Sequence, residues 1–278
     1  MEKMFQLSLT IKLALITGFV FMFGCANQNS NFTKSSETLF IHHIESRFLS
    51  KPTEIQVLTP DDLDYRKKYR VLYLLPVHQG HQPQALQEVK RLDIANKYNV
   101  ICVGPDYDAM PWYANHPTNE RNRQESYFLK DVIPLIDKNY PTIKSPEGRF
   151  LIGFSKSGWG AFSLLLRHPD MFCRAAAWDA PLAKDKPDRW GMAENFGTEQ
   201  NFKKYNILLL LKKRAEMLKK QPIRLYLSGF GVHGQSTIET HQRMQELGIP
   251  HYYDFSTKRK HKWESGWLEG LIDQLLKP

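Results

Sequence analysis

The sequence has few cysteines and no pattern of metal ligands. Three cysteines occur in 278 residues, and no group of cysteines and histidines has a spacing typical of a metal site. Cys102 and Cys173 lie in apolar segments that belong to well-separated strands of the predicted sheet. At about 4.8 Å per strand they are too far apart for a disulfide. We therefore expect two buried thiols, no metal and no other cofactor.

The chain also lacks a concentrated basic segment. Its net charge is +9, but the basic residues form small scattered groups at 66–68, 212–214 and 258–262. Neither a basic helix nor a nucleic-acid-binding motif is present. This pattern argues against a nucleic-acid partner and favours a mildly basic surface near anionic lipid.

No apolar run is long enough to cross a bilayer comfortably. The run at 13–23 follows basic residues and has the length of a signal-peptide core. Residues 22–25 (Met-Phe-Gly-Cys) resemble a bacterial lipobox. We therefore predict a signal peptide at 1–24, a lipidated Cys25 and a polar tether at 25–38, which would attach the protein to the bacterial cell envelope on its periplasmic or surface face. The alternatives are an ordinary signal peptide or an uncleaved anchor, with an incidental cysteine.

What the sequence does contain, from residue 39 onward, is an alternation of strand-like and helix-like segments. Apolar runs typical of buried strands occur at 70–75, 100–103, 150–152 and 174–178, and a further strand is expected at 223–228. The alternation predicts one α/β domain at 39–278, with a mostly parallel sheet of about eight strands and helices on both faces. The first two strands form an antiparallel edge, and residues 183–221 are a possible lid or insert.

The most informative segment is a strand, a tight turn and a helix at 149–166. The turn, Gly153-Phe154-Ser155-Lys156-Ser157-Gly158, holds one serine in the arrangement of a nucleophile elbow. The strained serine requires small residues two positions before and after it, and here these are Gly153 and Ser157. A glycine is usual at the second position, so Ser157 is a mild departure. The alternative is a strand–helix turn of some other α/β protein.

Several polar residues follow directly after predicted strands. They are Ser155, Asp179, the loop 76–80 and His261. Ligands of parallel sheets bind outside the carboxyl ends of the strands. We therefore expect these four features to meet at one edge of the sheet.

Other short segments accompany the elbow in a fixed order. They are Val-Leu-Tyr-Leu-Leu-Pro at 71–76, Pro-Trp-Tyr-Ala at 111–114, Gln-Glu-Ser-Tyr-Phe at 124–128, Arg-His-Pro at 167–169 and His-Lys-Trp at 261–263. Over roughly residues 40–276 the chain resembles the α/β-hydrolases of the putative-esterase group, which includes esterase D (S-formylglutathione hydrolase), feruloyl and siderophore esterases, and mycolyltransferases. The resemblance implies a serine carboxylesterase that forms an acyl-enzyme on a small ester of unknown identity.

The predicted catalytic residues follow from this chemistry. Ser155 is the expected nucleophile and needs a base in hydrogen-bond reach; His261 lies where the family places that base. The family usually supplies its acid after the next-to-last strand, but residues 229–236 contain no carboxylate. We rank Asp179 above Glu239 as the acid, and a Ser-His pair without an acid is a third possibility.

The oxyanion and pocket residues are predicted from neighbouring loops. The backbone N–H of Lys156 should be one oxyanion donor, and that of Val77 or His78 the other, since Pro76 has no N–H. Trp112, Tyr113 and His116 either form a wall of the substrate pocket or pack their loop onto the sheet; these two possibilities rank equally.

Two other functions remain open at this point. The missing carboxylate and the Ser157 departure are compatible with a catalytically inactive hydrolase-fold binding protein. An acyltransferase of the mycolyltransferase type would share the same catalytic residues.

Overall fold

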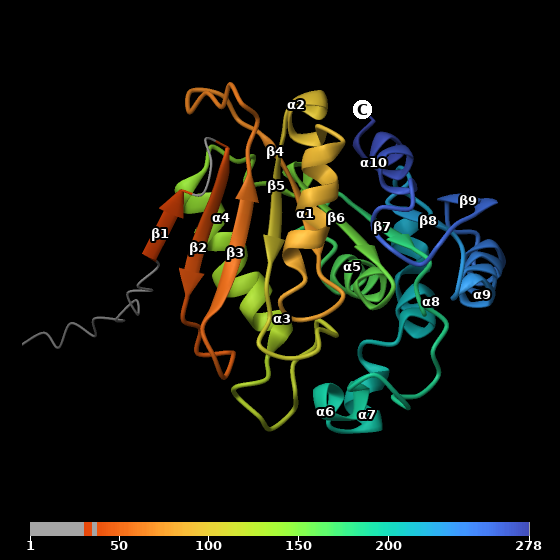
Figure 1. The fold of residues 1–278 in the computed structure, drawn as a ribbon. Helices are drawn as coiled ribbons and strands as arrows, with labels where there is room; N and C mark the ends of the chain where they lie inside the picture. Colours follow the sequence, from red (N-terminus) through yellow and green to blue (C-terminus); the bar gives the residue numbers. More distant parts are fainter. Residues whose placement is uncertain (1–30, 35–37, 278) are drawn as a thin grey trace, which may run out of the picture.

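A computed structural model describes residues 31–34 and 38–277 (Figure 1). The predicted signal peptide and Cys25 lie outside the described residues. None of the described helices is both long and apolar enough to cross a membrane.

The described residues form one nine-stranded sheet. Its strands lie in the order β1 (Asn31–Lys34), β2 (Leu39–Ile44), β3 (Thr53–Leu58), β5 (Val100–Pro105), β4 (Arg70–Leu75), β6 (Arg149–Phe154), β7 (Arg174–Trp178), β8 (Leu225–Phe230) and β9 (His251–Lys258). The pairs from β1 to β5 are antiparallel, and those from β5 to β9 are parallel. The predicted α/β class, with a mostly parallel sheet and an antiparallel edge, is therefore confirmed. β1 is an additional strand, within the segment predicted to be a tether.

Helices cover both faces of this sheet. They are α1 (Gln82–Arg91), α2 (Ile94–Tyr98), α3 (Gln124–Tyr127), α4 (Ile133–Asn139), α5 (Lys156–Arg167), α6 (Met192–Phe196), α7 (Glu199–Lys203), α8 (Ile207–Leu218), α9 (Gly234–Glu246) and α10 (Leu268–Leu276). The two short helical turns are η1 (Phe128–Val132) and η2 (Pro146–Gly148). In Figure 1, α1 lies in front of the sheet and α3 and α4 lie behind it.

The core is divided by the sheet into two layers. Along β4, successive side chains point to opposite faces. Val71, Tyr73 and Leu75 pack into the layer that contains α4, α5 and α8. Leu72 and Leu74 pack into the layer that contains α1, α2 and α10. The continuous apolar run at 70–75 is thus explained by a central strand that is buried on both faces.

Two helical segments are interrupted. The segment 82–98 forms α1 and α2 as separate helices, because Asp93 between them has a left-handed backbone with φ 53°. The segment 124–139 contains the π-helical turn η1 just before Pro134, which has no backbone N–H to donate to the preceding turn.

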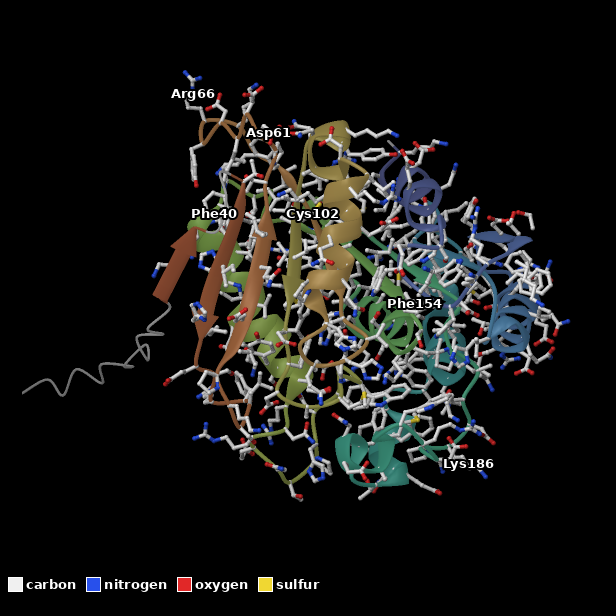
Figure 2. All side chains as sticks on the ribbon, viewed as in Figure 1. Phe40, Asp61, Arg66, Cys102, Phe154 and Lys186 are labelled. Carbon is white, nitrogen blue, oxygen red and sulfur yellow. The ribbon has the colours of Figure 1, made fainter. Side chains whose placement is uncertain are left out.

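Both described cysteines are free. Cys102 is fully buried in β5 (Figure 2), as predicted. Cys173 is only partly buried, so the prediction of a second buried thiol is wrong. β4 and β6 lie between β5 and β7, so the prediction that these two thiols form no disulfide is confirmed.

Candidate active site

The sharp turn between β6 and α5 places Ser155 in a strained conformation. Its φ is 56° and its ψ is −130°, which an L-residue adopts only when the surrounding structure requires it. Gly153 makes the turn possible. A Cβ at Gly153 would lie 2.1 Å from the carbonyl oxygen of Ser157, so no larger residue fits there.

Ser157 has a structural role in this turn. Its hydroxyl accepts a hydrogen bond from the backbone N–H of Phe154 at 2.9 Å and donates one to the carbonyl oxygen of Phe154 at 2.8 Å. Both bonds are buried, and together they close the turn across three residues. The serine that stands in place of the usual glycine therefore stabilises the elbow.

Asp179 follows β7 and contacts the predicted base. The Nδ1 atom of His261 lies 2.6 Å from Oδ2 of Asp179. A carboxylate only accepts, so Nδ1 carries the proton and Nε2 is the nitrogen left for another partner. The side chain of Asp179 is fully buried. Burial, the largest influence, raises its pKa, but hydrogen bonds from His261 and from the backbone of His233 outweigh burial and lower the pKa overall.

The loop after β8, which has no carboxylate, surrounds Asp179 with backbone. The N–H of Val232 donates to Oδ2 at 2.9 Å, and the N–H of His233 donates to Oδ1 at 2.7 Å. A Cβ on Gly231 would lie 2.2 Å from Oδ2 of Asp179, and one on Gly229 would lie 2.3 Å from its backbone nitrogen. The glycines of this loop therefore make room for a carboxylate that comes from the neighbouring strand.

Glu239, the alternative acid, is not brought to this site. It is exposed on α9, and its Oε1 accepts a hydrogen bond from Gln235 at 3.0 Å. In the described structure the carboxylate in contact with the His261 ring is that of Asp179.

Aromatic rings fix the position of His261. Its ring centroid lies 4.4 Å from that of Phe154 and 6.3 Å from that of Trp178. Trp178 in turn stacks on Trp267 at 4.9 Å with nearly parallel rings. Phe154, which immediately precedes the elbow serine, thus packs directly against the imidazole.

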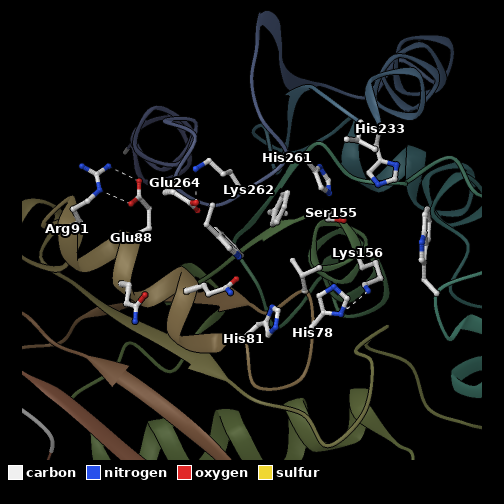
Figure 3. Close-up of a pocket in the computed structure, with 17 residues that line it drawn as sticks. His78, His81, Glu88, Arg91, Ser155, Lys156, His233, His261, Lys262 and Glu264 are labelled. Carbon is white, nitrogen blue, oxygen red and sulfur yellow. Dashed lines mark hydrogen bonds and ion pairs between the residues drawn. The ribbon is translucent and has the colours of Figure 1, made fainter.

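Ser155 and His261 line one cavity of about 860 Å³ (Figure 3). Val77, His78 and Lys156, the predicted oxyanion residues, line the same cavity. The N–H of Lys156 is in the first turn of α5, where no intrahelical acceptor exists. The structure therefore gathers at one edge of the sheet all the residues predicted for the nucleophile, the base and the oxyanion site.

The loop that carries Val77 and His78 is stabilised at both ends. The carbonyl oxygen of Pro76 accepts a hydrogen bond from the hydroxyl of Tyr113 at 2.5 Å. The N–H of Gly80, which has a φ of 70°, donates to Oδ1 of Asp106 at 2.6 Å. These bonds fix the backbone between residues 76 and 80 next to Ser155.

The predicted pocket residues lie elsewhere. Trp112 and Tyr113 are fully buried, and neither they nor His116 line the cavity. Tyr113 packs beneath the loop after β4, and Nε1 of Trp112 donates to the carbonyl oxygen of Trp190 at 2.7 Å. Of the two possibilities that the sequence left open for these residues, only packing of the loop is compatible with this geometry.

Other residues, not predicted as pocket residues, form the walls. These include His81, Trp190, Val232, His233 and Trp263. Trp190 comes from the segment predicted as a lid, and Trp263 follows His261 by two residues. Their proximity to the active site could therefore have been predicted from the sequence. The sequence carried no such signal for Val232 and His233, since they line the cavity only because their loop encloses Asp179.

Glu125 is one of the contacts between the segment 183–221 and the body of the protein. The carboxylate of Glu125 accepts a hydrogen bond from the hydroxyl of Tyr205, within this segment, at 3.0 Å. The same carboxylate binds Arg167 at 2.7 and 3.0 Å and His168 at 2.7 Å, both at the end of α5. Burial raises the pKa of Glu125, but the bonds from His168 and Arg167 dominate and lower it to about 2. Glu125 is thus ionised at neutral pH and is a structural residue at the base of this segment.

Known proteins are similar to this chain in sequence and in fold. A family model described as "Putative esterase" matches residues 46–277. Esterase Rv1288 of Mycobacterium tuberculosis (strain ATCC 25618 / H37Rv) is 31% identical over 136 residues. That match covers 46% of this chain and only 29% of the relative.

Solved structures show the same fold. A ferulic acid esterase is 21% identical with a TM-score of 0.66, covering 90% of this chain and 97% of that one. An S-formylglutathione hydrolase from Agrobacterium tumefaciens is 14% identical with a TM-score of 0.74, covering 88% of this chain and 97% of that one. These likenesses show that the fold is that of the α/β-hydrolases.

Proposed function

Because the chain belongs to the putative esterase family, we propose that it is a serine carboxylesterase in which Ser155 is the nucleophile, His261 the base and Asp179 the orienting acid. The observation that carries the proposal is the 2.6 Å hydrogen bond between His261 Nδ1 and Asp179 Oδ2, at a cavity that Ser155 also lines. It gives the imidazole the tautomer that a general base requires.

The reaction begins with attack by the Ser155 hydroxyl oxygen on the ester carbonyl carbon. Nε2 of His261 takes the hydroxyl proton, and the backbone N–H groups of Lys156 and of Val77 or His78 donate to the oxyanion. His261 then returns the proton to the departing alcohol, leaving an acyl group on Ser155. A water molecule then attacks the acyl-enzyme while the same imidazole takes its proton. His261 returns this proton to the Ser155 oxygen as the acid is released, which restores the free enzyme.

The experiment combines labelling with turnover. A fluorophosphonate probe should label the full chain, and a short p-nitrophenyl ester should be hydrolysed. Ser155→Ala should abolish both, with the circular dichroism spectrum unchanged. Labelling that survives in Ser155→Ala contradicts the assignment of the nucleophile. A folded protein with no labelling favours the binding-protein alternative, and faster product formation with an added alcohol favours acyl transfer.

We also propose that the protein is a lipoprotein of the bacterial cell envelope, attached through Cys25. The support is the sequence of residues 22–25 after an apolar run. Cells expressing the full chain should incorporate a fatty-acid label into it, and Cys25→Ala should prevent this incorporation. Equal incorporation by the variant contradicts the proposal.

A further inference from the structure

One charged group in the cavity is not used by the proposed mechanism. The side chain of Lys156 belongs to the residue directly after the nucleophile, and the residue is 4% exposed. Its Nζ lies 3.4 Å from Nδ1 of His78 and 2.7 Å from Sδ of Met110. Figure 3 shows the side chains of Lys156 and His78 pointing toward one another beside Ser155. A neutral imidazole and a thioether are weak partners for a buried ammonium.

The other charges in the cavity lining are already paired. Glu88 binds Arg91 through two hydrogen bonds of 2.7 Å, and Glu264 pairs with Lys262 at 2.8 Å. No described carboxylate lies within 4.0 Å of Nζ of Lys156, although both of these line the same cavity. The described lining contains three lysine or arginine residues, and of these Arg91 and Lys262 have a carboxylate partner whereas Lys156 has none.

The neighbouring histidines cannot supply the missing counter-ion, because an imidazole is either neutral or positively charged. Burial, together with the charges of Lys156 and His81, lowers the pKa of His78. His78 is therefore neutral and accepts from the ammonium through Nδ1. Burial, with the charge of His261, lowers the pKa of His233 to about 4. The cavity thus holds a positive charge with no protein anion opposite it.

A buried ammonium without a counter-ion is costly. A methionine or leucine would fill the same space at the start of α5 without that cost, so the fold gives no reason for the charge. Burial lowers the pKa of Lys156 to about 8, so the group is still mostly charged at neutral pH. An anion in the cavity would supply the missing partner at a position close to the nucleophile.

We propose that Lys156 makes the enzyme selective for esters that carry a carboxylate or another anionic group near the scissile bond. This inference rests on the proposed esterase function and names the class of its substrate. The anionic group binds Nζ of Lys156 in place of the Met110 thioether, while the N–H of the same residue donates to the oxyanion. The ammonium selects the substrate, and the chemical step remains that of Ser155 and His261.

The test uses esters that differ only in charge. In the first pair the difference is on the acyl side: monomethyl succinate has a carboxylate where methyl butyrate has a methyl group. In the second pair the difference is on the alcohol side: acetoxyacetate has a carboxylate where ethyl acetate has a methyl group. We expect kcat/KM of the full chain to be at least tenfold higher for the anionic member of one pair. Lys156→Met should lower that ratio at least tenfold, and Lys156→Arg should retain most of it.

Lys219→Met is the matched control, because it removes a lysine that has a carboxylate partner, Glu216 at 2.7 Å, and that does not line the cavity. Its selectivity ratio should stay within twofold of that of the wild type. A wild-type ratio near one in both pairs overturns the proposal. So does a Lys156→Met variant that loses the charged and neutral esters equally, since the ammonium would then act on the oxyanion instead of on the substrate anion.

A binding measurement separates this inference from the proposed function. Ser155→Ala cannot form an acyl-enzyme, so calorimetry on this variant reads ester binding alone. It should bind the preferred anionic ester at least tenfold more tightly than the neutral partner, and the double variant with Lys156→Met should lose this difference. Absence of turnover and of probe labelling contradicts the esterase function, whereas equal binding of both members of each pair contradicts the role of Lys156.

Discussion

The two corners that hold the catalytic groups are built in opposite ways. In the elbow, the contacts that close the turn around Ser155 join residues within 153–158, and the N–H of Ser155 adds one longer-range bond to the carbonyl oxygen of Trp178 at 3.1 Å. In the corner around Asp179, the contacts join residues far apart in the chain. Asp179 is 53 and 54 residues from the backbone donors Val232 and His233, and 82 from His261.

This difference explains how each corner is encoded. A local turn needs particular residues at fixed short spacings, so it is visible as a motif. The acid corner needs only that a carboxylate follows one strand and that small residues follow the next. Gly229 and Gly231 leave the space that Asp179 occupies, so the absence of a carboxylate after β8 is part of the same arrangement as its presence after β7.

The largest effect is expected from the acid itself. Asp179→Asn should lower kcat by roughly 10³–10⁴-fold, because an amide no longer fixes the imidazole tautomer or stabilises the imidazolium. Glu239→Gln is the matched control and should change kcat less than twofold. Both are measured with a p-nitrophenyl ester. A loss of only a few-fold in Asp179→Asn, with a large loss in Glu239→Gln, would move the acid to α9.

A smaller effect is expected from the loop that encloses Asp179. Gly231→Ala adds a Cβ 2.2 Å from Oδ2 of Asp179; the carboxylate or the loop must therefore move, and we expect kcat to fall about 10²-fold. Gly270→Ala, where a Cβ meets nothing within 4 Å, should leave kcat unchanged. Wild-type kcat in Gly231→Ala would show that the corner is not closely packed.

The same distinction decides what could be predicted from the sequence. The buried strands, the elbow and the strand-end positions of Asp179 and His261 follow from local patterns. The direction in which the Tyr113 side chain points does not follow from such a pattern. Its ring fills the space beside Gly160, where a Cβ would lie 2.1 Å from the ring. A contact between residues so far apart leaves no local signal, so the aromatic loop could be read equally as a pocket wall or as packing.

In the elbow, removing the Ser157 hydroxyl should lower the stability of the fold. Ser157→Ala loses two buried hydrogen bonds and leaves the N–H of Phe154 without its partner, so the free energy of unfolding should fall by about 1–3 kcal/mol. Ser163→Ala is the control, because its hydroxyl is buried on the same helix with no partner among the described residues; this change should be neutral or slightly stabilising. Equal values for the two variants in urea titrations would contradict the role given to Ser157.

The last change is at Lys156, directly before Ser157, where the buried ammonium should reduce stability in a pH-dependent way. Burial lowers its pKa from 10.5 to about 8. Between these values the unfolded chain binds more protons than the folded one, so the contribution of Lys156 to the unfolding free energy becomes more favourable as pH rises from about 8 to 10.5. His78, its titratable neighbour, has a lowered pKa and is neutral throughout this range.

Lys156→Met should therefore be more stable than the wild type at pH 7, with the difference shrinking toward pH 10.5. Urea titrations of both proteins at several pH values measure this difference. A variant less stable than the wild type at pH 7 would mean that the ammonium stabilises the elbow. The charge of Lys156 would then be explained by the stability of the elbow, and no substrate anion would be needed to account for it.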